Sequence, residues 1–444
     1  MTAKELEIKL DGFDKAERLE ALKQLKKTVK PEPGKNKGFV NLHCHTFYSF
    51  NGFGYSPERV AWMAYCEGLS TVGTVDFDVL DAVNETLESG RILGIRAVSG
   101  IETRVFVKDL GGKIINSPGE PGVYYLVGTG FYKKPDEWSK SAKLLQKFGR
   151  IARERNILRL TKVNQSLKEI AIDYDRDVLP LTPKGNATER HILSAFIKKA
   201  SDTFTEKNKL DDYWAEKLGL DKEQASGLSG KPAELAEAIR SKLFKKASNG
   251  ALDVSDSFPA LEEVVEMIKD EGALPTAAYL DGTSECEKDI RSLLAYMMSK
   301  GVAVLNIVPD RNWNIKDPAE KELKVANLRE AILAARELKL PVIAGTEMNK
   351  TGLKQVDDFN APELKPYLND FLSGAYLVYG HTIVAKYFDM GYNSAWAVKN
   401  LAERGKRNEF YAAAGRKIDP SKDYSKAVNS VKNSISPEKL LELL

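Results

Sequence analysis

The sequence predicts an α/β fold in which mainly parallel strands form a barrel or a doubly wound sheet. Short runs rich in β-branched and aromatic residues alternate with helical segments along most of the 444-residue chain. Polar and acidic side chains follow the ends of several of these runs, where functional residues gather in folds of this class. The chain is long enough for one large domain with additions or for two domains.

The expected elements begin with an amphipathic helix at 14–30, which ends at a segment rich in proline and glycine. Strands are expected at 38–43, 71–76, 96–102, 122–129, 273–279, 301–307, 340–346 and 374–380. Helices are expected between most of them, for example at 56–68, 79–93, 286–300 and 320–338.

The alternation of strands and helices stops between about 136 and 260, where the sequence is nearly all helical and highly charged. This stretch predicts a helical insertion or cap. We therefore divide the chain into an N-terminal helix and linker (1–37), a barrel that contains the insertion (38–384) and a C-terminal helical extension (385–444).

Composition and charge argue against several classes of function. The chain is 43% hydrophobic and 29% charged, and its net charge of +3 is spread evenly, so we expect no nucleic-acid or membrane partner. The N-terminus lacks the apolar core of a signal peptide, and no run approaches the roughly 18 apolar residues that span a bilayer. The three cysteines are widely separated and fit reduced thiols, which favours a cytoplasmic protein.

Two of the four histidines, His43 and His45, stand one residue apart at the end of the first expected strand. Residues i and i+2 of a strand point to the same face, so both imidazoles can approach one metal ion. An isolated HxH pair is more often structural than metal-binding. Here Glu102 and Glu347 add carboxylates at the ends of later strands, which favours a metal site.

Five motifs follow one another in a specific order: HxHxxxS with a later SP at 43–57, TVDFD at 74–78, SGIE at 99–102, ERHILSAF at 189–196 and AGTEMN at 344–349. Together they resemble the polymerase and histidinol phosphatase (PHP) superfamily over roughly residues 38–350. The resemblance implies a distorted seven-stranded β/α barrel, similar to a TIM barrel, with a helical insertion. It also implies hydrolysis of phosphate esters, which typical members carry out with three metal ions.

Several ligand positions of that family are occupied here by residues that bind metals poorly. The substituted positions are Asn51, Phe77, Tyr125, Ala278 and Asn349. The positions that serve one of the three metals all keep competent ligands, namely His43, His45, Glu102 and Glu347. The resemblance therefore implies a single retained site, and two imidazoles with two carboxylates suit Zn²⁺, Mn²⁺ or Fe²⁺.

Five further residues are catalytic candidates by position. We expect Asp76 to orient a water molecule or a ligand, Arg311 and Lys354 to hold an anion, and His191 or His381 to protonate a leaving group. Three of these residues have a structural alternative. Arg311 could belong to an Asp-Arg turn pair, His191 could be a packed residue at a helix start, and His381 could be a buried structural histidine.

The sequence thus favours a metal-dependent hydrolase of the PHP type that acts on a small anionic substrate, most simply a phosphoester. A single metal lacks the two-sided clamp of multi-metal phosphatases, and phosphomonoester hydrolysis is very slow without catalysis. Two alternatives remain open. One is a mono-metal lyase or isomerase that acts on a sugar acid or a related carbonyl compound, and the other is a catalytically degenerate barrel that binds a ligand.

Overall fold

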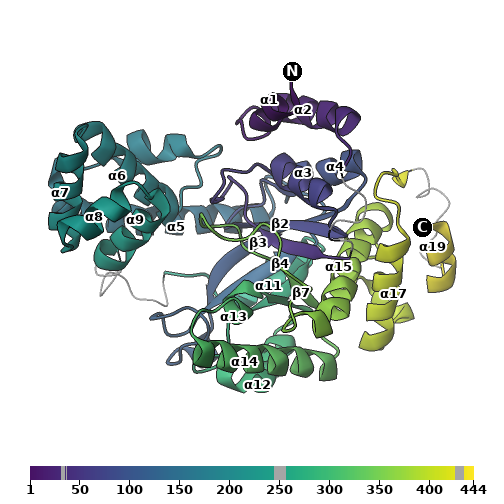
Figure 1. Cartoon of the computed structure of the whole chain (residues 1–444). Coiled ribbons are helices and arrows are strands. Elements are labelled where there is room, and N and C mark those ends of the chain that lie inside the picture. The colour runs from purple at the N-terminus through teal and green to yellow at the C-terminus, as the bar shows by residue number, and fades with distance from the viewer. Residues whose placement is uncertain (32–35, 37, 245–256, 426–434) are drawn as a thin grey trace.

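Seven strands form a single sheet that curls into a nearly closed barrel (Figure 1). The computed structural model describes residues 1–31, 36, 38–244, 257–425 and 435–444. In spatial and chain order the strands are β1 (Val40–Cys44), β2 (Thr71–Phe77), β3 (Arg96–Phe106), β4 (Val123–Thr129), β5 (Leu274–Tyr279), β6 (Val304–Ile307) and β7 (Val342–Ala344). The distorted TIM-like barrel predicted from the sequence is confirmed.

The barrel closes between β1 and the segment that follows β7. The backbone N–H of His45 donates to the carbonyl of Glu347, and the N–H of Glu347 donates to the carbonyl of His43, each at 2.7 Å. Gly345 allows this approach, because a Cβ at that position would overlap the backbone nitrogen of His43. The last part of the barrel wall is thus held directly against the HxH pair.

Strand β4 departs from the expected parallel pairing. It runs antiparallel to both β3 and β5, whereas β1–β2–β3 and β5–β6–β7 are parallel. The connection between β3 and β4 carries only the short 3₁₀ helix η1 (Lys108–Leu110), whereas a crossover to a parallel neighbour usually contains an α-helix. The expectation of parallel strands throughout is therefore wrong for β4.

Helices pack around the outside of the barrel and share one large hydrophobic core with it. They are α3 (Pro57–Glu67), α4 (Val83–Leu93), α11 (Leu261–Asp270), η6 (Glu287–Asp289), α12 (Ile290–Ser299), α13 (Asp310–Trp313), α14 (Pro318–Glu337), η7 (Lys365–Tyr367) and α15 (Leu368–Phe388). Local sequence sets their ends. In α3, for example, the side chain of Ser56 accepts a hydrogen bond from the backbone N–H of Arg59, and Gly68 ends the helix in the left-handed conformation.

The strand expected at 374–380 is wrong, because these residues lie within α15. Residues 374, 375 and 377–380 are buried, so the segment is apolar on almost every side. A helix buried on all sides has the same continuous apolar pattern as a buried strand, and periodicity does not separate the two. Helix α15 also runs across the boundary expected at 384/385 and packs against α17 (Arg404–Lys417).

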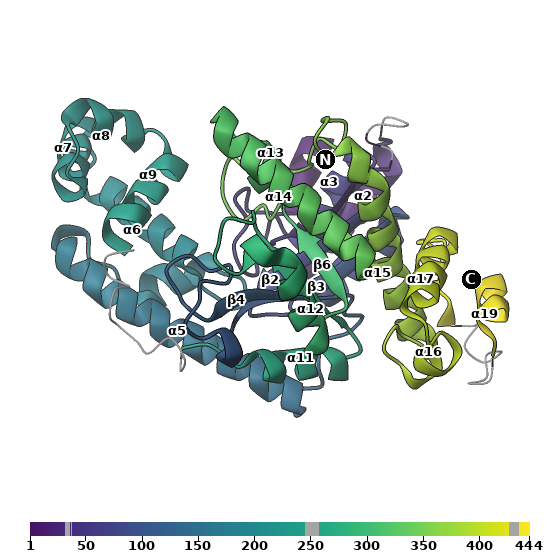
Figure 2. The same cartoon turned by 90° about the horizontal axis from the view of Figure 1, so that it is seen from below.

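The described part of the segment between β4 and β5 is helical and lies to one side of the barrel (Figures 1 and 2). Its elements are α5 (Lys140–Ser166), η2 (Lys168–Ile170), η3 (Tyr174–Val178), η4 (Leu179–Leu181), α6 (Glu189–Thr203), α7 (Lys207–Leu218), α8 (Lys222–Ser229), α9 (Pro232–Ile239) and η5 (Arg240–Phe244). Buried side chains from 160 to 244 form a hydrophobic cluster of their own. Part of the expected insertion, 245–256, lies outside the described residues.

The two ends of the chain add short helices to the barrel. At the N-terminus α1 (Ala3–Lys9) and α2 (Lys15–Thr28) cover α3 and α4, and α2 matches the helix expected at 14–30. At the C-terminus α16 (Ala395–Asn400), α17 and α19 (Pro437–Leu443) follow α15. Of the helices that the structure describes, none combines the length and the apolar character needed to cross a membrane.

A buried ion network attaches α2 to the barrel. Arg18 is 1% exposed, and its guanidinium donates to Glu58 of α3 at 2.8 Å and to Glu85 of α4 at 2.7 Å. The hydroxyl of Tyr48, in the loop after β1, donates to the same Glu85 at 2.9 Å. The N-terminal helices therefore connect to the loop that leaves the HxH pair.

Candidate metal centre

The side chains of His43 and His45, at the carboxyl end of β1, converge with that of Glu102, which is paired with the last residue of β2. The Nε2 atom of His43 lies 3.3 Å and that of His45 lies 3.0 Å from the same carboxylate oxygen, Oε2 of Glu102. Metal-ligating atoms of the three residues lie within 4.8 Å of one another, and all three residues are buried. The structure thus brings together three of the four ligands expected from the sequence.

Both Nε2 atoms are buried, and among the described residues the carboxylate of Glu102 is the group that approaches them. A buried cluster of this kind is costly unless a proton or a metal ion lies between the nitrogens and the carboxylate. Two imidazole nitrogens with a carboxylate oxygen form a donor set that suits Zn²⁺, Mn²⁺ or Fe²⁺. The three residues therefore fit a divalent metal ion.

The far nitrogen of His45 is held by a hydroxyl group. Its Nδ1 lies 3.0 Å from Oγ of Ser49, and Ser49 donates its own hydrogen to Oδ1 of Asp76 at 2.7 Å. Because that hydrogen points to Asp76, Ser49 accepts from Nδ1–H of His45. The proton is thereby kept on Nδ1 and the lone pair of Nε2 faces Glu102, which is the tautomer that a metal ligand needs.

The far nitrogen of His43 is held by an amide. Its Nδ1 lies 3.0 Å from Nδ2 of Asn306 on β6, while Oδ1 of Asn306 is buried without a partner. Turning the amide over brings Oδ1 to Nδ1 of His43, where it accepts the Nδ1 proton. In that orientation His43 has the same tautomer as His45. The orientation of the Asn306 amide therefore determines which nitrogen of His43 carries the proton.

Charges inside the cluster stabilise one another. Burial alone would raise the pKa of Glu102, but the adjacent imidazoles of His43 and His45 hold it well below its usual range. Burial alone would lower the pKa of His43, but the carboxylate of Glu102 raises it. In a metal-bound centre, the ion would take the place of a proton between these nitrogens and the carboxylate.

Asp76 lies behind the cluster rather than in it. It is 0% exposed, and its oxygens accept from the backbone N–H and the hydroxyl of Thr46, each at 2.7 Å, as well as from Ser49. Its pKa is raised by burial, which these hydrogen bonds oppose. The structure therefore gives Asp76 contact with His45 through Ser49.

Glu347 stands beside the cluster, but its carboxylate is occupied. Arg311 of α13 donates to Oε1 of Glu347 from Nε at 3.1 Å and from Nη2 at 2.9 Å, and Nη2 also lies 3.0 Å from Oε2. The expected four-ligand set is thus divided in this structure between a cluster of three residues and an ion pair.

His191 lies in the helical insertion near the barrel mouth. Its ring packs edge-on against Phe50 with centroids 5.1 Å apart, and its Nδ1 accepts from the backbone N–H of Thr188 at 3.1 Å. Burial lowers the pKa of His191 to about 4, so the ring is neutral near pH 7. With Nδ1 accepting, the proton lies on Nε2, and His191 can donate a hydrogen bond but is a poor acid.

Another side chain of the insertion ties two loops of the barrel mouth together. Nδ2 of Asn186 donates to the carbonyl of Tyr48 at 3.0 Å and to the carbonyl of Phe77 at 2.8 Å. Tyr48 follows β1, and Phe77 ends β2. The insertion is therefore fastened to the end of the barrel that carries the metal centre.

Lys354 lies in the loop after β7 and is paired with its neighbours. Its Nζ is 3.2 Å from Oδ1 of Asp310 and 4.1 Å from the centroid of the Trp313 ring. Arg311 is the more exposed of the two expected anion-binding groups, with 46% of its side chain accessible against 34% for Lys354.

His381 is at the other end of the barrel. It lies in α15, not at a strand end, and its Nδ1 accepts from the backbone N–H of Tyr392 at 2.9 Å. Its ring faces Gly130, which follows β4. Because β4 is antiparallel to its neighbours, Gly130 lies at the amino ends of the parallel strands, opposite the metal centre. The expectation that His381 follows a strand end at the mouth is wrong.

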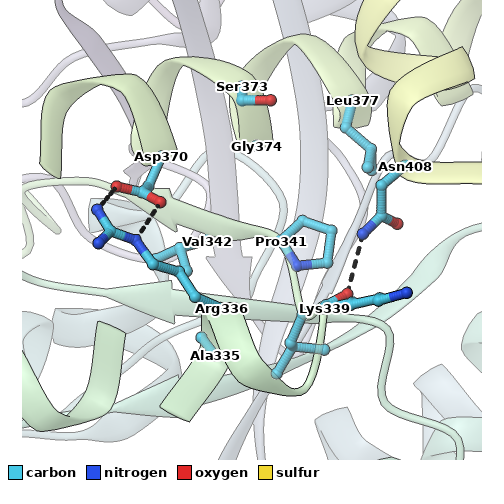
Figure 3. A pocket seen from close by; sticks show the side chains of 11 residues that line it. Ala335, Arg336, Lys339, Pro341, Val342, Asp370, Ser373, Gly374, Leu377 and Asn408 are labelled. Carbon is cyan, nitrogen blue, oxygen red and sulfur yellow. Dashed lines mark hydrogen bonds and ion pairs between the residues drawn. The ribbon is translucent and has the colours of Figure 1, made fainter. Parts of the chain in front are cut away.

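A small pocket lies at this same opposite end, beside Val342 at the start of β7 (Figure 3). It is lined by α14, α15 and the loop between α14 and β7, and an ion pair of Arg336 with Asp370 crosses one side of it. Nδ2 of Asn408 donates to the carbonyl of Lys339 at the other side, at 2.9 Å. None of the expected metal ligands or catalytic residues lines this pocket.

Aromatic or apolar side chains fill three of the five positions where the resemblance implied lost ligands. Phe77 stacks on the imidazole of His45, with ring centroids 4.6 Å apart and planes at 29°. Tyr125 and Ala278 pack with Val75 and Val127 in a small hydrophobic cluster inside the barrel. Among the described residues, His43, His45 and Glu102 are the one group of three that could hold a metal ion.

Four residues near the centre were not among the sequence-based candidates: Ser49, Asn306, Arg104 and Arg155. Ser49 is the serine of the HxHxxxS motif, so a signal for it existed. Arg104 lies two residues after Glu102 on β3, beyond the last residue paired with β2, and Arg155 comes from α5. Both guanidinium groups lie over the ring of Phe258, at 4.6 and 5.1 Å from its centroid, a meeting that sequence spacing does not indicate.

No family model matches the chain, and no curated protein sequence matches it. Solved structures similar to it include the following two. One is a proposed metal-dependent phosphoesterase from Bifidobacterium adolescentis, with a TM-score of 0.47, 17% identity and coverage of 74% of this chain and 96% of that chain. The other is an amidohydrolase from Chromobacterium violaceum with bound sulfate and no metal, with a TM-score of 0.47, 15% identity and coverage of 76% and 96%.

Proposed function

We propose that the protein is a metal-dependent hydrolase of the PHP type that uses one divalent metal ion and acts on a small anionic substrate, most simply a phosphoester. The observation that carries this proposal is the convergence of two buried Nε2 atoms on the carboxylate of Glu102. His43, His45 and Glu102 would hold the ion. A divalent metal supplies Lewis acidity at such a site, polarising a phosphoryl or carbonyl oxygen and acidifying water.

The surrounding residues would prepare the ligands. Ser49 and Asp76 keep the proton of His45 on Nδ1, and Asn306 can do the same for His43. Outer hydrogen bonds of this kind typically change metal affinity by about 10- to 100-fold. Phe77 packs on the face of His45 and keeps water from that side of the ring.

Basic side chains at the mouth support an anionic substrate. Arg311 is half-exposed, and a guanidinium matches the geometry of a phosphate or carboxylate. Arg155 has a buried Nε without a hydrogen-bond partner among the described residues, and desolvation followed by the nearby charge of Arg104 lowers its pKa to about 9. An anion beside these groups would relieve both the repulsion and the unsatisfied donor.

His191 would contribute as a neutral donor. Its Nδ1 is engaged by Thr188, so Nε2–H can donate to an oxygen of the substrate without releasing a proton. The leaving group of the substrate would then have to obtain its proton from water or from the substrate itself. We accordingly propose His191 as a residue that orients the substrate, in place of the general acid expected from the sequence.

Metal analysis of the purified protein tests the proposal. We expect about one metal per chain in the wild type and its loss in His45→Gln and Glu102→Gln. His191→Gln is the matched control, because it removes a mouth histidine outside the cluster and should leave the metal content unchanged. Three metals per chain, or none, would contradict the one-metal proposal.

Substrate panels then separate the reaction classes. A hydrolase of this kind should release inorganic phosphate from phosphomonoesters or phosphodiesters, with the rate lost in Glu102→Gln. Turnover of sugar acids without phosphate release would favour a lyase or isomerase. Metal binding with no turnover in either panel would favour a binding protein.

A further inference from the structure

Glu347 is built into the same backbone ladder as the two histidines. Its N–H and C=O are both hydrogen-bonded to β1, at His43 and His45, so its side chain leaves the chain between the two metal ligands. Its φ of 62° is left-handed, as is that of the next residue, Met348, at 57°. Non-glycine residues in this conformation are uncommon and persist where the surrounding structure requires them.

The carboxylate of Glu347 nevertheless points to Arg311. All three contacts between the two groups lie between 2.9 and 3.1 Å, and the Glu347 side chain is 10% exposed. Its charge still acts on His43, where it adds to the effect of Glu102. Glu347 is therefore close enough to influence the cluster while it is held outside it.

Arg311 has a single carboxylate partner among the described residues. Among the described residues its ion pair with Glu347 is the one within 4.0 Å, and 46% of its side chain is accessible. If Glu347 left, Nε and Nη2 of Arg311 would face the mouth as an unoccupied fork, the arrangement that binds phosphate or carboxylate through two parallel hydrogen bonds.

We propose that Glu347 is shared between Arg311 and the metal centre, so that a bound metal draws the carboxylate from Arg311 and thereby frees Arg311 to bind the anionic group of the substrate. This inference rests on the proposed function. Its consequence is a coupling: metal and anion each increase the affinity of the protein for the other, by the same factor.

The first test uses inorganic phosphate and metal-free protein, with binding measured by calorimetry. Glu347→Gln removes the carboxylate from Arg311, so this variant should bind phosphate at least about tenfold more tightly than the wild type, and the double variant Glu347→Gln/Arg311→Gln should lose the gain. If Glu347→Gln binds phosphate no better than the wild type, the proposal is overturned.

A matched control exists at the far end of the barrel. Arg336 is also 46% exposed and donates to Asp370 through the same two atoms, Nε and Nη2 (Figure 3). Asp370→Asn should free this arginine without any gain in phosphate affinity. A gain equal to that of Glu347→Gln would mean that any released arginine suffices, which also overturns the proposal.

The second test measures Zn²⁺ affinity by competition with a chelator. Arg311→Gln releases Glu347 and should tighten Zn²⁺ binding, and Glu347→Gln/Arg311→Gln should lose that tightening. Phosphate should bind more tightly to the Zn²⁺-loaded wild type than to the metal-free protein. Zn²⁺ that binds equally to the wild type and to Arg311→Gln would refute the sharing of Glu347 and leave the proposed function intact, whereas a wild type that binds no metal would refute both.

Discussion

Asp76 and His45 do not touch, yet the hydroxyl of Ser49 joins them: it lies 3.0 Å from Nδ1 of His45 and donates to Asp76 at 2.7 Å. This chain fixes which nitrogen of His45 carries the proton. It also connects Asp76 to the candidate metal centre without placing it among the candidate ligands.

Removal of the hydroxyl of Ser49 should therefore weaken metal binding. We expect Ser49→Ala to reduce Zn²⁺ affinity by about 10- to 100-fold, because Nδ1 of His45 loses its acceptor and both tautomers become accessible. Chelator competition measures the change. Ser99→Ala is the control, since Ser99 is also buried and its hydroxyl bonds to Thr74; an equal loss of affinity in that variant would argue against the orienting role of Ser49.

Stability should depend on pH through His381. Burial lowers its pKa to about 3, so between pH 6.5 and that value the unfolded chain binds a proton that the folded chain does not, and stability falls as the pH falls. Because an unperturbed histidine titrates near pH 6.5, the loss at pH 5 is about 2 kcal/mol. The free energy of unfolding, measured with urea, should fall between pH 7 and pH 5 by about 2 kcal/mol less in His381→Gln than in the wild type.

Stability should also fall with decreasing pH through His191. Its pKa of about 4 predicts a loss of similar size, about 2 kcal/mol, between pH 7 and pH 5. His191→Gln should remove that loss as well, and the effects of the two substitutions should add, because the residues lie at opposite ends of the barrel. A variant whose stability falls with pH as steeply as that of the wild type would show that the histidine is protonated in the folded state.

The buried pairing of Arg18 predicts a large effect from a residue far from the cluster. Arg18→Met leaves Glu58 and Glu85 without their guanidinium partner, and loss of one member of a buried ion pair typically costs about 3–5 kcal/mol. Thermal and urea unfolding measure it. Lys9→Met, which removes the exposed pair of Lys9 with Glu17, should change stability by less than about 1 kcal/mol.

Two glycine substitutions should act in opposite directions. Gly345→Ala places a Cβ against the backbone of His43 and should both destabilise the fold and weaken metal binding. Gly149 lies within α5 with open space around it, so Gly149→Ala should stabilise the protein by about 1 kcal/mol and leave metal affinity unchanged. Equal metal affinity in Gly345→Ala and the wild type would show that the ladder between β1 and Glu347 is not needed by the centre.

Much of the fold could be predicted from local patterns, and the two errors have separate physical causes. The seven strands found were expected within a few residues, because apolar runs bounded by turns report burial and length together. The strand predicted at 374–380 is wrong because these residues are buried on almost every side of α15, which removes the helical periodicity of apolar residues. The antiparallel direction of β4 could not be predicted because it depends on the path of the connecting segments, which the residues of the strand do not encode.

The candidate site divides in the same way. The spacing of His43 and His45 shows that they share a face, and a strand end indicates where Glu102 lies. The partner of Glu347 depends on the position of Arg311, which is 36 residues earlier in the chain and lies in α13. Competition of this kind between tertiary partners leaves no periodic signal in the sequence.

The amide of Asn186 has a consequence for how such a chain can change over generations. Among the described residues, its Nδ2 donates to two main-chain carbonyls, at Tyr48 and Phe77, and to no side chain of the barrel mouth. Main-chain carbonyls keep their positions when side chains are exchanged, so the rim can acquire new residues for a new substrate while the junction with the insertion persists. Substrate specificity and the attachment of the insertion thus depend on different residues. The residues that set specificity can change while the insertion stays attached to the barrel.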